Sequence, residues 1–298
     1  MVIIEFLLVL KKRGKKVCLM EVTQQPATVT SVPKLAYDGG QIDVIWDNHE
    51  MAVQWYEKHM GFTRKQVMNG KNEKLSAAEI MTELRAGLWL KSVLTDRRVN
   101  HFFAERGTVD PNVRWCHATR DLEAEHAYFQ KEGIRTSDIY YTADGKGHFD
   151  FWGFEGTRLT AAESQDIQDG SRFGGSWVRI GVRNLQEART WYEKYLGMVL
   201  LEDYSTKGSL KMGLFLEHHT DAHSVWWLDQ LSEDAPDNGP IDGPCRPYCV
   251  THDGESFSQY FQYLRDNGIR TSDYITGGFF AYFHFYDPDG NRFNVYKY

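Results

Sequence analysis

The stretch Gly-Ile-Arg-Thr-Ser-Asp at residues 133–138 recurs without change at residues 268–273. Trp-Tyr-Glu-Lys at residues 55–58 likewise recurs at 191–194. Both pairs are separated by about 135 residues, which is far longer than the repeats of about 20–50 residues that build solenoid proteins. Two such identities in one register indicate an internal duplication. Each copy is therefore predicted to be a module of domain size.

Single residues keep the same register. Asn48, Ala52, Gly61, Phe151, Gly156 and Arg158 return as Asn184, Ala188, Gly197, Phe285, Gly290 and Arg292. The register predicts an N-terminal extension over residues 1–36, a first module over 37–162, a linker over 163–175 and a second module over 176–298. The linker is assigned because its sequence is polar and rich in glycine.

The bulk composition is that of a soluble globular protein, with 42% hydrophobic and 25% charged residues among 298. Aromatic residues reach 14%, which favours a core or a pocket rich in rings. The formal net charge of −7 argues against a nucleic-acid partner, because binding to phosphates requires a basic face. A small molecule is the expected partner.

The cysteines and the N-terminus favour a cytoplasmic protein. Cys18, Cys116, Cys245 and Cys249 have no zinc-site spacing, and four reduced thiols are expected. The apolar run at residues 1–10 precedes its basic run, which is the reverse of a secretory signal, and it is too short to span a bilayer. No membrane partner is expected.

Both modules follow one local pattern. An alternating strand is followed by an asparagine at a helix N-cap, then by an amphipathic helix that ends at a glycine. Asn48 and Asn184 are the predicted caps, and Gly61 and Gly197 the predicted ends. A second strand and helix follow in each module, which predicts an α+β fold. Residues 217–244 are predicted to be a long loop.

The closing turn of the second module carries a family resemblance. Phe-Tyr-Asp-Pro-Asp-Gly-Asn-Arg-Phe at 285–293, together with the strand and helix pattern at 177–197, resembles the vicinal oxygen chelate superfamily. This superfamily includes glyoxalase I, extradiol dioxygenases and the bleomycin- and fosfomycin-resistance proteins. The resemblance covers about residues 37–298. It implies tandem paired βαβββ modules, the glyoxalase-like fold, with curved mixed sheets around a shared cavity.

The resemblance also implies positions for the ligands of a divalent metal, which would be Fe, Mn, Zn or Ni. These positions hold Gln41, Trp177, Arg114, Arg246, Thr160 and Asn294. Only Gln41 is a credible ligand, and arginines repel a dication. The family metal site is therefore expected to be lost, and no cofactor is expected. A shift of one residue in the strand register would bring His117, His148 or His284 to the same face.

Alternation along the strands predicts the residues that bind a ligand. They are Gln41, Asp43, Arg114, Thr160, Trp177, Arg179, Arg246, Tyr248 and Asn294. One interpretation is an internal ion pair between Asp43 and Arg179. The other is that spare arginines bind an anion while Trp177 and Tyr248 stack on an aromatic group.

Three functions follow from these alternatives. The first is a binding protein of the bleomycin-resistance type, which holds a small anionic or aromatic molecule in the cavity between the modules without a metal. The second is a metal-dependent lyase or ring-cleaving dioxygenase with a non-standard ligand set. The third is a scaffold whose pocket is no longer used. No catalytic residue is assigned, and the chain is expected to be a monomer or a homodimer.

Overall fold

The computed structural model describes residues 35–72, 77–84, 88–93, 112–165, 167, 172–216, 219–236, 243–251, 253–274 and 281–297. Almost all of the predicted N-terminal extension, Cys18 and residues 166 and 168–171 of the predicted linker lie outside this range. Within the described part of the chain, no helix combines the length and the apolar character that crossing a membrane requires.

Four strand and helix units follow one another along the chain. The first contains β1 (Leu35–Ile45), η1 (Trp46–Asn48), α1 (His49–Met60), β2 (Arg64–Asn72), β3 (Ala77–Leu84) and β4 (Leu88–Val93). The second contains β5 (Val113–Thr119), α2 (Leu122–Lys131), β6 (Tyr140–Tyr141), β7 (Gly147–Trp152), η2 (Phe154–Gly156) and β8 (Arg158–Glu163).

The second half of the chain repeats the pattern. The third unit contains β9 (Gly174–Val182), α3 (Leu185–Leu196), β10 (Val199–Tyr204), η3 (Ser205–Lys207), β11 (Ser209–Leu216) and β12 (His219–Gln230). The fourth contains β13 (Cys245–Thr251), α4 (Gly254–Asp266), β14 (Ala281–Tyr286) and β15 (Arg292–Lys297). The prediction of one long loop over 217–244 is wrong for residues 219–230, because these form β12 and pair with β9 and β11.

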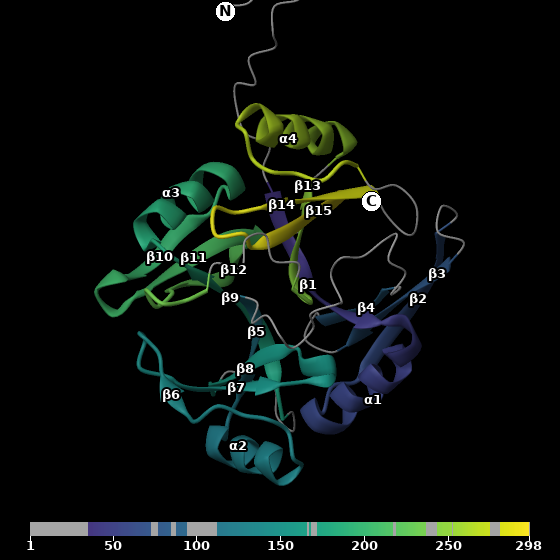
Figure 1. Cartoon of the computed structure of the whole chain (residues 1–298), viewed down its shortest axis with the longest axis vertical. Helices are drawn as coiled ribbons and strands as arrows, with labels where there is room; N and C mark the ends of the chain where they lie inside the picture. Colours follow the sequence, from purple (N-terminus) through teal and green to yellow (C-terminus); the bar gives the residue numbers. More distant parts are fainter. Residues whose placement is uncertain are drawn as a thin grey trace, which may run out of the picture. The chain divides into compact units, whose positions relative to one another are not determined.

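The strand pairing joins units from different repeats. Within each unit the first strand lies parallel to the last, as β1 does to β4 and β9 to β12. Between units, β1 lies antiparallel to β13, and β5 lies antiparallel to β9. The first unit is thus paired with the fourth, and the second with the third (Figure 1).

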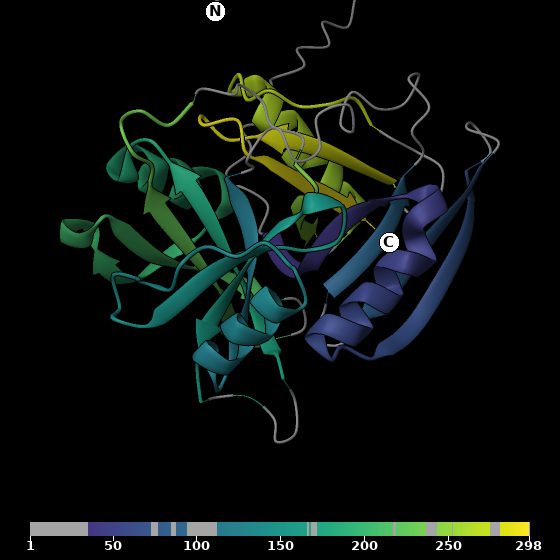
Figure 2. The same cartoon turned by 60° about the horizontal axis from the view of Figure 1, so that its bottom comes forward.

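We call β2-β3-β4-β1-β13-β15-β14 the outer-unit sheet and β10-β11-β12-β9-β5-β8-β7-β6 the inner-unit sheet. The two are joined by one parallel pairing between β1 and β11. Both are mixed and curved, and each helix covers one side of the strands of its own unit (Figures 1 and 2). The predicted α+β, glyoxalase-like fold of tandem βαβββ modules is confirmed.

The helix ends explain much of the repeated sequence. Gly61 and Gly197 have φ values of +66° and +70°, so both end their helices in the left-handed conformation as predicted. The Asn184 side chain accepts hydrogen bonds from the backbone N–H groups of Gln186 and Glu187, which confirms it as a cap. Asn48 stands at the N-cap position but makes no such bond.

Alternation divides each sheet into an apolar and a polar face. Along β1, the fully buried Ile42 and Val44 belong to the hydrophobic core that also contains residues of α1. Gln41 and Asp43 alternate with them and point to the other side of the sheet. The inner-unit sheet repeats this arrangement on β9, where Val178 and Ile180 join the core and Arg179 faces away from it. The polar faces are therefore the places to look for a functional site.

Candidate functional site

The nine predicted ligand-binding residues fall into two groups, because the units pair across the repeats. Four lie on the polar face of the inner-unit sheet: Arg114, Thr160, Trp177 and Arg179. Five lie on the polar face of the outer-unit sheet: Gln41, Asp43, Arg246, Tyr248 and Asn294. The strand pairing thus gives two clusters on different sheets, which we describe separately.

The inner-unit cluster is held together by strand register. Arg114 on β5 lies opposite Arg179 on β9, and Cys116 lies opposite both Trp177 and Thr160. Directly paired residues project to the same face of a sheet, so these side chains are neighbours.

Arg179 forms a bidentate ion pair in this cluster, and its partner is Asp229 on β12. Its Nε and Nη2 donate to the two carboxylate oxygens at 2.7 and 2.6 Å. The predicted pair between Asp43 and Arg179 is therefore wrong. Asp43 lies on β1 and Arg179 on β9, and β11 and β12 separate these two strands in the sheet order.

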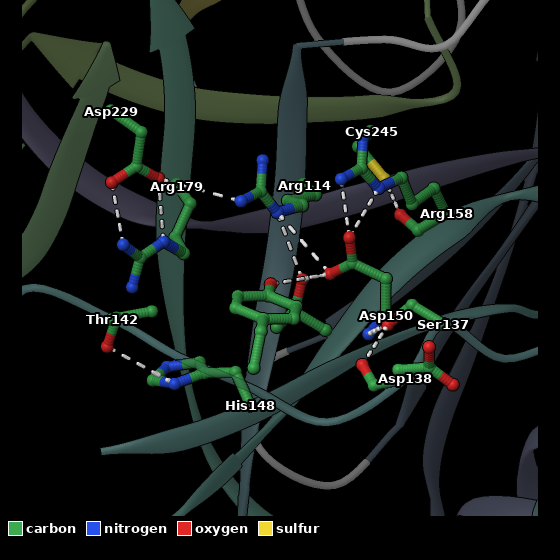
Figure 3. Close-up of polar contacts among 12 residues, drawn as sticks. Arg114, Ser137, Asp138, Thr142, His148, Asp150, Arg158, Arg179, Asp229 and Cys245 are labelled. Carbon is green, nitrogen blue, oxygen red and sulfur yellow. Dashed lines mark hydrogen bonds and ion pairs between the residues drawn. The ribbon is translucent and has the colours of Figure 1, made fainter. Parts of the chain in front are cut away.

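Asp150 on β7 is the second carboxylate of the inner-unit cluster. It accepts hydrogen bonds from the Thr160 hydroxyl at 2.6 Å, the Tyr140 hydroxyl at 3.0 Å and Arg158 Nε at 2.9 Å. Figure 3 shows Arg114 between Asp150 and Asp229. Its Nε donates to Thr160 at 3.0 Å, while the carboxylates of Asp229 and Asp150 lie 3.5 and 3.8 Å from its nitrogens.

The charges of this cluster are fixed at neutral pH. Burial works against ionisation of Asp229, but Arg179 and Arg114 outweigh it and hold the pKa of Asp229 below its usual range. Burial lowers the pKa of His148 to about 4, and Arg179 adds to this effect. Burial also raises the pKa of the Cys116 thiol to about 12. The arginines and aspartates are therefore charged, while His148 and Cys116 are neutral.

Aromatic rings complete the inner-unit cluster. The indole Nε1 of Trp177 is buried and has no hydrogen-bond partner within the described part of the chain. Trp227 on β12 lies opposite Arg179, whose guanidinium carbon is 5.0 Å from the ring centroid. Tyr204 stacks against Trp227 at 5.5 Å. The cluster thus combines guanidinium groups with indole rings.

The outer-unit cluster is built around Asp43 and Arg246. These two side chains form a buried ion pair, and Gln41 Nε2 donates to Asp43 at 2.5 Å. On β15, Arg292 Nε donates to Asn294 Oδ1 at 3.2 Å. Its Nη2 lies 3.1 Å from Nδ1 of His284 on β14. Burial, together with Arg292, lowers the pKa of His284 to about 2, so this imidazole is neutral.

Both clusters contain residues that the sequence reasoning missed, namely Asp150, Arg158 and Asp229 on one sheet and Arg292 on the other. A signal for two of them was available, because Arg158 and Arg292 are identical residues at matching positions of the repeat. His148 and His284 reach the polar faces without any shift of register. His117 lies on the opposite face, where its ring is 5.2 Å from Phe62.

Of the six positions at which the family resemblance places metal ligands, only Gln41 offers a credible donor oxygen. Arg114 and Arg246 are cations, Trp177 offers an N–H, and the Thr160 hydroxyl is engaged with Asp150. Among the described residues, no group of three or more His, Cys, Asp or Glu side chains could hold a metal ion. These residues do not fit a divalent metal, whose ligands are carboxylate oxygens and neutral imidazoles.

Comparison with known proteins gives a family match and several structural likenesses. Residues 176–295 match the model of the Glyoxalase/Bleomycin resistance protein/Dioxygenase superfamily. No curated protein sequence matches the chain. Glyoxalase I from Zea mays is 14% identical, with 89% of this chain and 92% of that chain covered and a TM-score of 0.58.

A putative dioxygenase from Bacillus subtilis is similar to a comparable extent. It is 10% identical, the match covers 89% of this chain and 86% of that chain, and the TM-score is 0.59. At such identities these likenesses show a shared fold that extends over both repeats.

Proposed function

Because the chain belongs to the Glyoxalase/Bleomycin resistance protein/Dioxygenase superfamily, we propose that it binds a small aromatic anion on the polar face of the inner-unit sheet without a metal. The observation that carries this proposal is the incomplete hydrogen bonding of the Arg114 guanidinium. Its only hydrogen bond among the described residues is to the neutral hydroxyl of Thr160. A guanidinium that is 12% exposed and has N–H groups to spare is suited to an anionic ligand.

Trp177 supports the same ligand class. It lies diagonally across the strand pair from Arg114, because Arg114 opposes Arg179 and Cys116 opposes Trp177. Such diagonal neighbours are separated by about 7–8 Å, within reach of one small molecule. The free N–H of Trp177 would donate to the anion, and its ring and that of Trp227 would contact an aromatic group.

Arg114 keeps its positive charge at neutral pH. Burial opposes the charge of Arg114, but Asp150 and Asp229 raise its pKa above the usual range. Arg179 shares Asp229 with Arg114, so one carboxylate neutralises part of two cations. A ligand carboxylate would supply the missing negative charge and accept from the remaining N–H groups.

Calorimetry with benzoate tests this function. Wild-type protein is expected to bind, Trp177→Phe to bind about tenfold more weakly, and Arg114→Lys to lose affinity because lysine lacks the planar fork. Trp89→Phe, the same change on the outer-unit sheet, is the matched control and should bind as wild type does. Absence of binding to the wild type, or equal affinity in all variants, would contradict the proposal.

The metal-free part of the proposal has its own test. Purified protein is expected to contain no stoichiometric iron, manganese, zinc or nickel by elemental analysis, and a chelator should leave benzoate affinity unchanged. A full equivalent of one of these metals would instead favour a lyase or a dioxygenase with an unusual ligand set.

A further inference from the structure

Two buried amides on the outer-unit sheet each have one unmet hydrogen-bonding group. The Gln41 and Asn294 side chains are fully buried. Among the residues that the structure describes, Oε1 of Gln41 has no donor and Nδ2 of Asn294 has no acceptor. Leaving such groups unpaired away from water costs free energy, and native proteins avoid it.

The hydrogen-bond partners of the two amides fix the orientation of each. Gln41 Nε2 donates to the Asp43 carboxylate, which can only accept, so the free atom of Gln41 is the acceptor Oε1. Asn294 Oδ1 accepts from the Arg292 guanidinium, which can only donate, so the free atom of Asn294 is the donor Nδ2. Turning either amide over would place like groups against each other. The cluster therefore presents one acceptor and one donor.

The strand order sets the distance between these groups. Gln41 lies on β1 and Asn294 on β15, with β13 between them. Gln41 lies opposite Arg246, whereas Asn294 lies opposite Tyr248, two residues further along β13. Two strand spacings of about 4.8 Å and this offset of about 6.6 Å place the two residues about 12 Å apart. One molecule can satisfy both only if its own donor and acceptor lie at opposite ends.

The strand between the amides offers an aromatic surface. Tyr248 on β13 lies opposite Asn294, is half-buried, and contacts Tyr296 edge-on at 5.2 Å. Tyr282 on β14 lies opposite Tyr296 on the same face. Arg246 on β13 is already paired with Asp43. A flat, uncharged ring fits such a surface better than a second anion does.

We infer that the outer-unit cluster is a second binding site, which takes a neutral planar molecule with a hydrogen-bond donor at one end and an acceptor at the other. The donor binds Gln41 Oε1, the acceptor binds Asn294 Nδ2, and the ring lies over Tyr248. This site differs in chemistry from the inner-unit cluster, where guanidinium groups bind an anion. The repeated fold thus holds two sites for two classes of ligand.

A matched pair of probes tests this site in the wild-type protein. 4-Hydroxyacetophenone carries a hydroxyl donor and a carbonyl acceptor at opposite ends of its ring, whereas 4-methoxyacetophenone has no hydrogen-bond donor. Calorimetry is expected to give at least tenfold tighter binding of the hydroxyl compound. Equal affinities, or no binding of either compound, would overturn the inference, as would satisfaction of both amides by buried water alone.

Variants then assign the two contacts. Gln41→Met should remove the preference for the hydroxyl compound, and Asn294→Asp should weaken both probes about tenfold because an acceptor replaces the donor. Val199→Ala, at an exposed position of β10 on the inner-unit sheet, should leave both affinities unchanged. Gln41→Met should keep the benzoate affinity of wild type, so failure of this site is distinguishable from failure of anion binding. A Gln41→Met protein that is folded by circular dichroism and keeps the preference would refute the assignment.

Discussion

Asp150 on β7 and His284 on β14 occupy equivalent positions in the two repeats, and each is held by the serine of the repeated hexapeptide. Ser137 N donates to the Asp150 carbonyl at 2.8 Å, and Asp150 N donates to Ser137 Oγ at 2.9 Å. Ser272 and His284 make the same two bonds at 2.8 and 3.0 Å. The repeated hexapeptide therefore fixes the strand that carries a polar-face residue in both clusters.

Removing these hydroxyls should weaken the fold. Ser137→Ala and Ser272→Ala each leave a strand N–H without its acceptor, and we expect each to lower the free energy of unfolding by about 1 kcal/mol. Urea denaturation followed by circular dichroism measures this. Ser258→Ala, at an exposed position of α4, is the control and should stay within about 0.5 kcal/mol of wild type. Equal stability of all three variants would show that the serine contacts are dispensable.

Asp150 itself should matter more than its serine. It is 4% exposed and lies among Arg114, Arg158 and Thr160. Asp150→Asn removes the charge that offsets the buried guanidinium groups, and we expect a loss of about 3 kcal/mol. Asp138→Asn, at an exposed residue of the hexapeptide, is the matched control. A loss as small as that of the control would mean that the cluster does not depend on this carboxylate.

The pH dependence of stability has a defined sign at His148. Burial, reinforced by Arg179, lowers its pKa from 6.5 to about 4 in the folded state. The unfolded chain therefore takes up the proton first, so the stabilising contribution is complete above pH 6.5 and is lost as the pH falls to about 4. The stability gap between wild type and His148→Gln should shrink between pH 7 and pH 4.5 in urea titrations. A stability difference that is constant over this pH range would contradict the lowered pKa of His148.

Asp287 lies in the turn between β14 and β15. Its contribution to stability should fall as the pH rises, which is the opposite of the contribution of His148. Burial raises its pKa from 3.8 to about 7, although Asn291 and Tyr192 donate hydrogen bonds to it. Its contribution is complete below pH 3.8 and is lost as the pH rises through 7. The stability of wild type relative to Asp287→Asn should therefore be greater at pH 5 than at pH 8. The reverse order would show that the carboxylate is ionised throughout.

The sequence predicts the units well but not the way in which they pair. Alternation and helix ends such as Gly61 and Gly197 are local signals, and they lie where they were predicted. The pairing of β1 with β13 and of β5 with β9 joins equivalent first strands. Every unit begins with a strand of the same alternating pattern. The pattern therefore does not show which two of these strands pair. The pair between Asp43 and Arg179 was predicted wrongly for this reason.

The missed site residues have similar causes. Asp229 lies on β12, in a stretch whose polar residues suggested a loop, and the strand is apparent only once its partners β9 and β11 are known. Asp150 alternates with Phe149 and Phe151, which are both fully buried, so the period of two could have placed it on the polar face. The contacts of Arg114 with two carboxylates from different repeats depend on tertiary structure and have no local signal.

The junction between the two sheets gives the last prediction. Gly40 on β1 lies against the buried ring of Trp115 on β5, whose Nε1 donates to the carbonyl of Gln41 at 3.2 Å. A Cβ atom at residue 40 would lie 2.8 Å from Cζ2 of this ring. We therefore expect Gly40→Ala to lower the free energy of unfolding by about 1–3 kcal/mol, because a tightly packed ring must move.

A double-mutant cycle makes this prediction specific. Trp115→Phe replaces the indole by a smaller ring. Gly40→Ala should therefore lower the free energy of unfolding less in the Trp115→Phe protein than in wild type. Gly254→Ala is the control, because the nearest atom to its added Cβ is the flexible end of Lys297 at 3.3 Å and alanine favours the helix. Additive losses in the cycle would mean that residue 40 and the indole do not interact. The contact between β1 and β5 would then add nothing to the pairing of β1 with β11, which joins the two sheets.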